Sequence, residues 1–449
     1  MSKPLVSIVK GPKGTVDSQV EIDKLMDRTF ELLGGVKNMI APDKKVILKP
    51  NAGHVNYPEE SVDTNPDVIR AIIHSIRKVN PEQRIIIAEA GAIGVNTMQA
   101  LEASGMVKVA EEENVELLDL KAEGTKLFTY KVPNPQSDIK QIQLPCVLFD
   151  EDTYLINVPI MKAHTCCMFT NALKNLKGCV QDHHHFIMHC TNLMGAMFDL
   201  GEAIRPHLNI ADMIRPLEGF GPHSGFPVEY DVIVASTDIA ATDVVSASVA
   251  SIPLEGLEFM EMAAKKPLGE YDINNMELVG DPLDQVKRYM YIPYIKGWEN
   301  WPDYHIHIKN ACSSCQSLVS YTLSRITGMG KYDEFKGTHI IVGRQNEMPE
   351  DVKPGDPYLL FGDCTETLWK KQQAAGVPDC ENLHVTGCPP SEPYPYWVLE
   401  DKVTYGEIDD LRGRNTKDLA IFNKWMEAER QKLEAEGTLK DSLKVYSAD

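Results

Sequence analysis

Four cysteines in the last third of the sequence have the spacing of a metal-binding set. Cys312 and Cys315 are separated by two serines, so their thiolates lie within one turn. Cys364 follows the strand-like run LLFGD, and Cys388 follows HVTG and precedes two prolines. Glycines close before these two cysteines allow the backbone to approach sulfur, and the prolines stiffen the last loop. We therefore expect three loops at strand ends to bring four thiolates to one metal centre.

Cysteine thiolates bind both zinc and iron–sulfur clusters, so the ligand type alone does not identify the metal. Structural zinc sites commonly carry two CxxC pairs, whereas this region has one pair and two single cysteines. The spacing therefore favours a [4Fe–4S] cluster, with structural zinc and unligated thiols as the alternatives. Cys380, in the turn-like VPDC, is expected to be a spectator.

A second group of cysteines and histidines lies in the middle of the chain. Irregular spacing and apolar neighbours predict buried thiols, and a second cluster is the alternative. These cysteines are Cys166, Cys167, Cys179 and Cys190. The run His183–His185 is typical of a polar loop, and metal binding is the alternative. In a helix, only His185 and His189 would share a face.

The same region is depleted in acidic residues. Residues 153–181 contain no Asp or Glu, although the chain has 65 of them. We expect a strand, then a loop with Lys162 and His164, then a helix with Lys174 and Lys177. Ligands of open α/β sheets bind at the carboxyl ends of strands, where helix N-termini favour anions. The pattern predicts a pocket for a carboxylate or phosphate, and a solvated lysine face is the alternative.

Strand-like and helix-like segments alternate around both groups. Strands are expected at 44–50, 83–90, 115–120, 154–159 and 231–236, and helices at 66–79, 169–177 and 239–250. A shorter series has a helix near 317–327 and strands at 339–344, 357–363 and 382–387. The alternation predicts an α/β protein: a mostly parallel sheet domain, a second, smaller α/β iron–sulfur domain, and a C-terminal helix.

The chain of 449 residues is long enough for several domains. We expect an α/β domain over 1–285, an aromatic linker over 286–309, an iron–sulfur α/β module over 310–400, and a helical tail over 401–449. The crowded tyrosines and tryptophans of the linker predict a buried seam between domains, with a partner-docking surface as the alternative.

Composition excludes several classes of function. The 65 acidic and 45 basic residues give a net charge of −20, which repels phosphate backbones and anionic lipid, so we expect no nucleic acid partner. Apolar runs fall far short of the roughly 20 residues of a membrane helix, so no membrane insertion is expected.

No secretory leader is recognisable, and ten cysteines then suit a reducing compartment, so we expect a cytoplasmic protein. Neither GxGxxG nor a P-loop motif is present, which disfavours classical NAD binding and P-loop ATP hydrolysis.

Two resemblances add to these observations. CxxC, then Gly-x-Cys, then GCPP at successive strand ends resembles the proximal [4Fe–4S] site of [NiFe]-hydrogenase small subunits and the related complex I subunit. VILKPN, VPIMKAHTCCMFTNALKNLKG, HLNIADMIRPLEGFGPHSG and VIVASTDIAATDVV, in this order, are similar to the family known as domain of unknown function 362.

The second resemblance implies an α/β domain often found with iron–sulfur modules, and a set of site residues. Carried over to this chain, they are Lys49, Asn51, Lys162, His164, Thr165, Asn171, Lys174, Asn175, Asp212, Glu218, Asp238 and Asp243. The members expected to bind substrate are Lys49, Asn51, Thr165, Asn171, Lys174, Asn175, Asp238 and Asp243. Lys162, His164, Glu218 and Asp212 would be catalytic, although each acid could equally be a helix or turn cap.

These observations together predict an iron–sulfur redox protein. We expect a reductase that acts on a small anionic substrate or cofactor with electrons from one [4Fe–4S] cluster. A ferredoxin-like electron donor and a homo-oligomeric assembly fit this hypothesis. The alternatives are an electron-transfer or cluster-assembly partner without its own substrate, and a non-redox isomerase or lyase.

Overall fold

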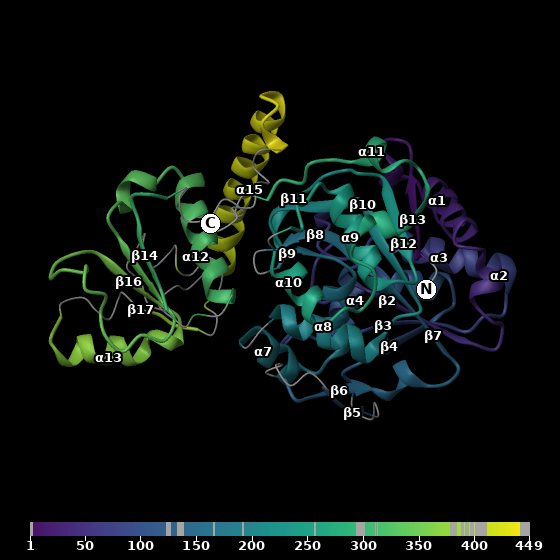
Figure 1. The fold of residues 1–449 in the computed structure, drawn as a ribbon, viewed down its shortest axis with the longest axis horizontal. Coiled ribbons are helices and arrows are strands. Elements are labelled where there is room, and N and C mark those ends of the chain that lie inside the picture. The colour runs from purple at the N-terminus through teal and green to yellow at the C-terminus, as the bar shows by residue number, and fades with distance from the viewer. Residues whose placement is uncertain are drawn as a thin grey trace. The chain divides into compact units, whose positions relative to one another are not determined.

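The chain divides into two compact units, residues 1–188 with 193–290 and residues 189–192 with 291–449 (Figure 1). The computed structural model describes residues 3–122, 127–132, 139–164, 167–190, 193–255, 257–292, 301–309, 311, 313–377, 384–387, 390, 395, 399 and 411–440. Within these ranges, no helix is long and apolar enough to cross a membrane.

The first unit is built on one large sheet. Its strands are β1 (Leu5–Lys10), β2 (Lys45–Pro50), β3 (Ile85–Glu89), β4 (Glu116–Asp119), β7 (Thr153–Val158), β8 (Ile160–His164), β9 (Met168–Thr170), β10 (Leu208–Phe220), β11 (Ser224–Pro227), β12 (Val232–Ser236) and β13 (Glu277–Gly280). The order is β13-β1-β12-β10-β7-β2-β3-β4, and β8, β9 and β11 extend the sheet beside β10. Strands β7, β2, β3 and β4 are parallel, so their carboxyl ends meet at one edge. Strand β12 is antiparallel to both β1 and β10.

Helices cover both faces of this sheet. They are α1 (Gln19–Leu32), α2 (Val36–Met39), α3 (Pro66–Val79), α4 (Thr97–Ala103), α5 (Met106–Glu112), α6 (Ala172–Asn175), α7 (Asp182–Cys190), α8 (Leu193–Ile204), α9 (Ile239–Val249), α10 (Glu258–Lys265) and α11 (Leu283–Val286). Val46 and Leu48 of β2 share a core with α1, α3 and α5. On the opposite face, Asn157 of β7 donates to the carbonyl of Ala172 in α6 at 3.0 Å. Burial on both faces explains why the central strands are almost entirely apolar.

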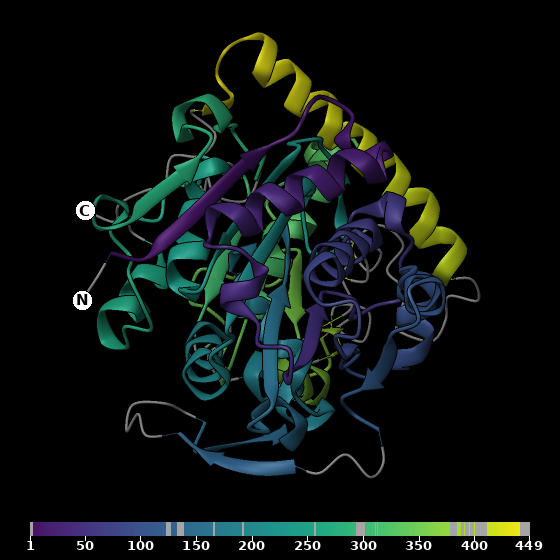
Figure 2. The same ribbon diagram turned by 90° about the vertical axis from the view of Figure 1, so that its right-hand side faces the viewer.

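Two local features of the first unit follow directly from its sequence. Helix α3 begins at Pro66, and the Asn65 side chain caps it by accepting a hydrogen bond from the Asp67 amide. The strands β5 (Leu127–Lys131) and β6 (Gln141–Pro145) form a separate antiparallel pair, at the bottom of Figure 2. The same view shows the purple helix α1 lying over the large sheet.

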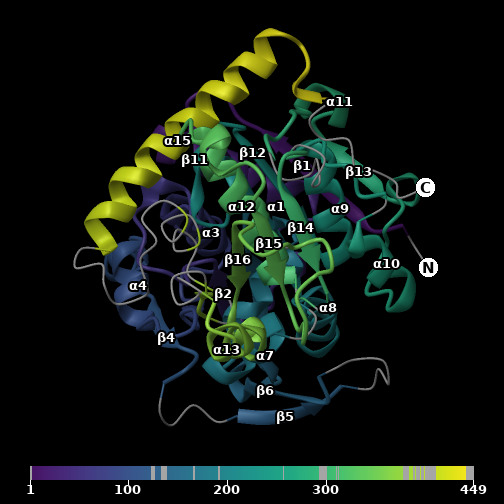
Figure 3. The same ribbon diagram turned by 90° about the vertical axis from the view of Figure 1, so that its left-hand side faces the viewer.

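The second unit has a small parallel sheet in the order β14-β15-β16-β17 (Figure 3). Its elements are β14 (His305–Ile308), α12 (Ser313–Gly328), β15 (His339–Val342), β16 (Tyr358–Phe361), α13 (Glu366–Ala374), β17 (His384–Val385) and α15 (Leu411–Ala435). Apolar residues of α12 pack with Ile340 and Val342 on one face. Leu368 of α13 packs with Ile341 on the other. Helix α15 contacts α12, where the rings of Phe422 and Tyr321 lie 5.6 Å apart.

The α/β class is confirmed, with a large, mostly parallel sheet and a second, smaller one. One expected helix is wrong: 169–177 begins in β9 and contains only the short α6. Phe169 and Thr170 are extended because β9 pairs with β8 as a hairpin. The range 286–309, expected as a linker, contains β14, and Trp301 and Tyr304 belong to the core of the second unit.

Candidate functional site

Polar side chains of the first unit gather where β2, β3 and β7 end. Lys49 is the last residue but one of β2, and Glu89 is the last residue of β3. Lys49 is in register with Asn157 of β7, so both side chains point to the face that α6 covers. The carboxyl ends of parallel strands are the usual ligand-binding edge of an open α/β sheet. This edge of the sheet is therefore the candidate site.

Lys49 and Glu89 form an ion pair in the interior of the first unit. Both side chains are almost fully buried, and the Lys49 Nζ lies 2.9 Å from each carboxylate oxygen. The backbone amides of Ala52 and Ala90 also donate to this carboxylate, at 3.0 and 2.9 Å. Burial raises the pKa of Glu89, and the Lys49 charge opposes that rise. A methyl group at Gly178 would lie 1.9 Å from Glu89 Oε1, so the pair requires glycine there.

A chain of asparagine side chains runs from this pair across the sheet. Asn51 donates to Asn175 Oδ1 at 3.2 Å, and Asn175 donates to Asn157 Oδ1 at 2.8 Å. Asn157 donates to Asn209 Oδ1 at 3.0 Å, and Asn209 donates to the Ser236 carbonyl at 3.4 Å. Buried polar networks whose members have partners make a site rigid. The network therefore gives this edge of the sheet a fixed polar floor.

Lys162 belongs to a second buried pair at the same edge. It lies on β8, and its Nζ donates to Asn51 Oδ1 at 2.7 Å and to the Val62 carbonyl at 2.5 Å. Asp63, the next residue, is buried, and neither carboxylate oxygen has a hydrogen bond of good geometry within the described ranges, although the Asn56 side chain is close enough to favour the ionised form. Burial raises the pKa of Asp63 and lowers the pKa of Lys162, while the charge of each favours ionisation of the other. Burial thus favours the neutral form of both groups.

Two histidines and two further lysines surround Lys162. The rings of His54 and His223 meet edge to face with centroids 4.2 Å apart. Burial, together with the smaller effect of the positive charges of Lys162, Lys174 and Lys177, lowers the pKa of His54 to about 4. Burial also lowers the pKa of His223 well below its usual value, and Lys162 and Lys174 add to this effect. Neutral imidazoles therefore lie in the positive potential of three lysines.

Strand β9 adds further polar groups beside Lys162. Thr170 is opposite Lys162 in the β8–β9 hairpin. In the part of the chain that the structure describes, Thr170 Oγ1 is buried without a hydrogen-bond partner, whereas the buried Asn171 side chain is close enough to Asp243 to oppose the rise of its pKa. Buried polar groups without partners are rare in native proteins and call for a ligand, water or ion. Together with Asp63, Thr170 therefore provides hydrogen-bonding capacity that is not fully used at this edge of the sheet.

The lysines expected in this region have different positions from those predicted. Lys162 and His164 lie on β8 and not in a loop. Lys174 lies on the short α6, and Lys177 lies in the 3-10 turn Leu176–Cys179 that follows it. Lys174 still comes near enough to Lys162 to lower its pKa. The strand arrangement thus replaces the expected loop as the element that positions Lys162. Thr165 lies outside the described residues.

Two candidate catalytic acids contact other parts of the chain. Asp212 accepts hydrogen bonds from the amides of Asn65 and Ile214, at 2.9 and 3.0 Å. Burial raises the pKa of Asp212 to about 6, although both amides oppose the rise. Glu218 is buried and accepts a hydrogen bond from the Tyr230 hydroxyl at 3.0 Å. Asp212 therefore fixes the start of α3. This contact agrees with the capping role that the sequence left open as the alternative to catalysis.

The two remaining acids cap helices. Asp243 accepts hydrogen bonds from the amides of Ala172 and Leu173, at 2.7 and 3.1 Å, and so holds the first turn of α6. Burial raises the pKa of Asp243 to about 7. Asp238 caps α9 by accepting from the Ala241 amide at 3.0 Å. These contacts connect α6 to α9, and so position Lys174 indirectly.

Sequence reasoning missed four residues of this site: Glu89, Asp63, His54 and His223. Glu89 had a usable signal, because it is the only acid in the apolar run RIIIAEA. His54 and Asp63 lie in the loop that follows the strand containing Lys49, where ligand-binding residues are common. His223 had no such signal, because only the fold brings it to His54.

The mid-chain histidines and cysteines have structural contacts. The run His183–His185 lies in α7, so the expected polar loop is wrong. His184 Nε2 accepts a hydrogen bond from the Gln143 amide at 3.0 Å, and His185 Nε2 contacts a backbone carbonyl. Burial raises the pKa of the Cys179 thiol to about 12, which makes it a poor ligand or nucleophile at neutral pH. The side chains here that lie outside the described residues are those of Cys166, His189 and Cys190.

In the second unit, three chain segments converge near Cys315. A methyl group at Gly362 would lie 3.3 Å from Cys315 Sγ and 3.5 Å from the Gly387 carbonyl. The Asp363 amide donates to that carbonyl at 3.0 Å. Cys364 is the next residue and is half-buried. The expected ligands Cys312 and Cys388, and the expected spectator Cys380, lie outside the described residues.

Comparison with known proteins gives matches over the first unit and beyond. The model of the family described as domain of unknown function (DUF362) matches residues 46–248. The thylakoid-associated protein sll1697 of Synechocystis sp. (strain ATCC 27184 / PCC 6803 / Kazusa) is 30% identical over 249 residues, which are 54% of this chain and 73% of that protein. A crystal structure of a protein from Thermotoga maritima covers 74% of this chain and 73% of its own, with 11% identity and a TM-score of 0.32. From the family match and the Synechocystis relative, we conclude that the chain belongs to the DUF362 family.

Proposed function

We propose that this protein is an iron–sulfur reductase that acts on a small anionic substrate bound beside Lys162. The observation that carries the proposal is the Lys162–Asp63 pair, which is buried at the ligand-binding edge of the sheet. The Asp63 carboxyl group has no hydrogen bond of good geometry among the residues described, and the nearby Asn56 side chain only partly offsets the effect of its burial. A carboxylate or phosphate ligand would supply acceptors for Lys162 and, when Asp63 is protonated, for Asp63 as well.

The charges around this pair support an anionic ligand. Lys174 and Lys177 add positive potential, as the lowered pKa of His54 records. The chain as a whole has a net charge of −20, so this concentration of lysines is local. A positive site in a negative protein attracts small anions while large polyanions are repelled.

In a reduction, these groups would have separate roles. The charge of a bound anion would favour the protonated form of Lys162 as the Asp63 carboxylate does, and Lys162 and Lys174 would then stabilise negative charge that develops on the substrate, since preorganised cations are effective in a site that excludes water. Asp63 would hold a proton near neutral pH because burial raises its pKa, and so would be a general acid. His164, on the same strand as Lys162, is a second candidate proton donor.

The electrons would come from a [4Fe–4S] cluster in the second unit. Its ligands would be Cys312, Cys315, Cys364 and Cys388, and a bound cluster supplies one electron at a time. The approach of Cys315 Sγ to Gly362, and of Gly362 to Gly387, supports this assignment, because these glycines lie just before Cys364 and Cys388. We further propose a cytoplasmic location and a ferredoxin-like donor, since thiolate ligands persist best in a reducing compartment.

Preparation of the protein without oxygen tests the cluster. We expect about four irons and four acid-labile sulfides per chain, because four thiolates match one cubane. An EPR signal should appear on reduction with dithionite. The Cys364→Ala variant should lose the brown absorbance, and the matched Cys380→Ala variant should keep it.

Two outcomes of this experiment would overturn the redox assignment. One zinc per chain without sulfide, in iron-replete cells, would show a structural zinc site. A cluster that strong reductants cannot reduce would instead favour a lyase or isomerase. Equal loss of iron in the Cys364→Ala and Cys380→Ala variants would contradict the ligand set.

A further inference from the structure

The small sheet of the second unit presents several histidines on one face. In β14, His305 and His307 alternate with isoleucines, so both histidines point to the same side. Register places His305 opposite His339 and His307 opposite Ile341. Ile341 packs on the face covered by α13, so the three histidines share that face. Cys315 packs in the core on the other face, with α12.

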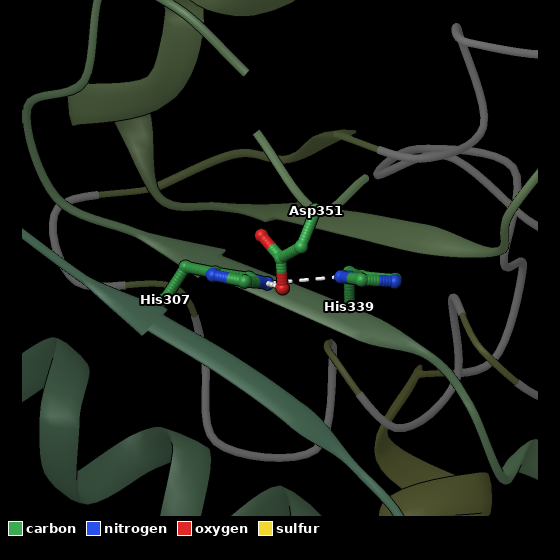
Figure 4. Close-up of side chains that lie close together, drawn as sticks. All are labelled: His307, His339 and Asp351. Carbon is green, nitrogen blue, oxygen red and sulfur yellow. Dashed lines mark hydrogen bonds and ion pairs between the residues drawn. The ribbon is translucent and has the colours of Figure 1, made fainter. Parts of the chain in front are cut away.

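Two of these histidines and one aspartate bring their ligand atoms together (Figure 4). His307 Nε2 lies 2.9 Å from His339 Nδ1 and 3.7 Å from Asp351 Oδ2. One ligand atom from each of the three residues lies within 4.8 Å of the others. Two ligands of a tetrahedral zinc ion, each about 2.0–2.1 Å from the metal, are about 3.3 Å apart. The His307–His339 and His307–Asp351 spacings are thus within a few tenths of an ångström of metal-binding geometry, whereas His339 and Asp351, within 4.8 Å of each other, would move closer together around an ion.

Neighbouring groups hold these side chains in place. Asp356 Oδ2 lies 3.6 Å from the other ring nitrogen of His339, Nε2, and accepts a hydrogen bond from the Lys353 amide at 2.7 Å. A carboxylate beside the second nitrogen of a ligating histidine is the common outer-shell arrangement of metal sites. The loop that carries Asp351 is anchored because Met348 and Val352 pack against the core.

We propose that His307, His339 and Asp351 bind one divalent transition-metal ion of the zinc type. Two imidazoles and one carboxylate suit Zn²⁺, Co²⁺ or Ni²⁺ better than Ca²⁺ or Mg²⁺, which prefer oxygen ligands. Three protein ligands leave a fourth position for water, as in zinc sites that bind a further ligand. Asp351 is largely exposed, so this position is open to solvent. The site is distinct from the cysteine set, because Cys315 lies on the opposite face of the sheet.

Metal titration of the full-length protein tests this site. Because cysteine thiolates can also bind zinc and the chain has ten cysteines, the test compares variants and does not rely on the total stoichiometry. In equilibrium dialysis against ZnCl₂, the wild-type protein should bind one more equivalent than the Asp351→Asn variant. Asp351 is exposed, so its replacement leaves the fold intact. His339→Ala should remove the same equivalent, whereas the matched control His305→Gln should keep it.

Cobalt distinguishes the two kinds of ligand. Co²⁺ at this site should give weak visible bands without the intense near-ultraviolet absorbance of cobalt thiolates. Those visible bands should be lost, or need at least tenfold more Co²⁺, in the Asp351→Asn variant. Equal zinc binding by wild type and Asp351→Asn would overturn the proposal. So would visible bands that are unchanged in the variant, or loss of binding in His305→Gln equal to that in His339→Ala.

Discussion

Two lysine–carboxylate pairs lie at the same edge of the large sheet, and they differ in how far their hydrogen bonds are satisfied. The Glu89 carboxylate accepts bonds from Lys49 and from two backbone amides. The Asp63 carboxylate has no hydrogen bond of good geometry within the described residues, although Lys162 and the Asn56 side chain are close enough to change its pKa. The first pair is complete as it stands, whereas the second has unused acceptors and donors.

The difference separates a structural role from a binding role. A buried ion pair whose partners are all present contributes to the fold, and loss of one partner leaves a buried charge uncompensated. A buried carboxyl group without a partner lowers stability and persists where another role requires it. We therefore assign Lys49 and Glu89 to the scaffold and Lys162 and Asp63 to ligand binding.

The largest expected effect is on the scaffold pair. Glu89→Gln should lower the free energy of unfolding by about 3–5 kcal/mol, because Lys49 stays buried without its counter-charge. The matched change Asp63→Asn should alter it by about 1 kcal/mol or less, since Asp63 lacks the close ion pair and the backbone hydrogen bonds that hold Glu89. Urea unfolding of both variants measures the difference. Equal losses in the two variants would contradict the distinction between the pairs.

A smaller effect is expected on ligand binding. Lys162→Met should weaken binding of inorganic phosphate or malonate roughly ten- to a hundredfold, because a hydrogen bond to a charged group is worth about 1.5–3 kcal/mol. Isothermal titration calorimetry measures this affinity. The control is Lys45→Met. Lys45 is also buried, but it is the first residue of β2 and pairs with Asp150 and Asp152, away from the carboxyl end of that strand. Equal weakening in both variants, or in neither, would remove the anion site and leave an electron carrier as the function.

The elements of the fold could be predicted largely from local patterns. The range 66–79 is the range of α3, because a cap, a proline and an apolar stripe all agree there. The helix expected over 169–177 failed because its residues pair with β8, a tertiary contact that overrides local preference.

The site could be predicted only in part. The absence of acids over 153–181 indicated Lys162 and Lys174, since charge depletion is visible in the sequence. The sequence alone did not indicate Asp63, because the contact between its neighbour Val62 and Lys162 joins residues that are 100 positions apart. Asp212, in contrast, was identified from the sequence, but its context did not distinguish a catalytic role from a capping role. Contacts with the amides of Asn65 and Ile214 favour capping.

A pH profile extends the comparison to Asp212. Burial raises its pKa to about 6, so between about pH 4 and 6 the folded protein keeps a proton that the unfolded chain has lost. The unfolding free energy contributed by this group is therefore greatest below pH 4 and falls as the pH rises through this window. The slope is at most about 1.4 kcal/mol per pH unit for one group.

Asp212→Asn should abolish this contribution. The difference in unfolding free energy between wild type and variant should fall between pH 4 and 6 and then stay constant, as urea unfolding at each pH can measure. If Asp212 only caps α3, phosphate affinity should be unchanged in the variant. A difference that is constant across this range would contradict the raised pKa. A loss of phosphate affinity as large as that of Lys162→Met would instead place Asp212 among the binding residues.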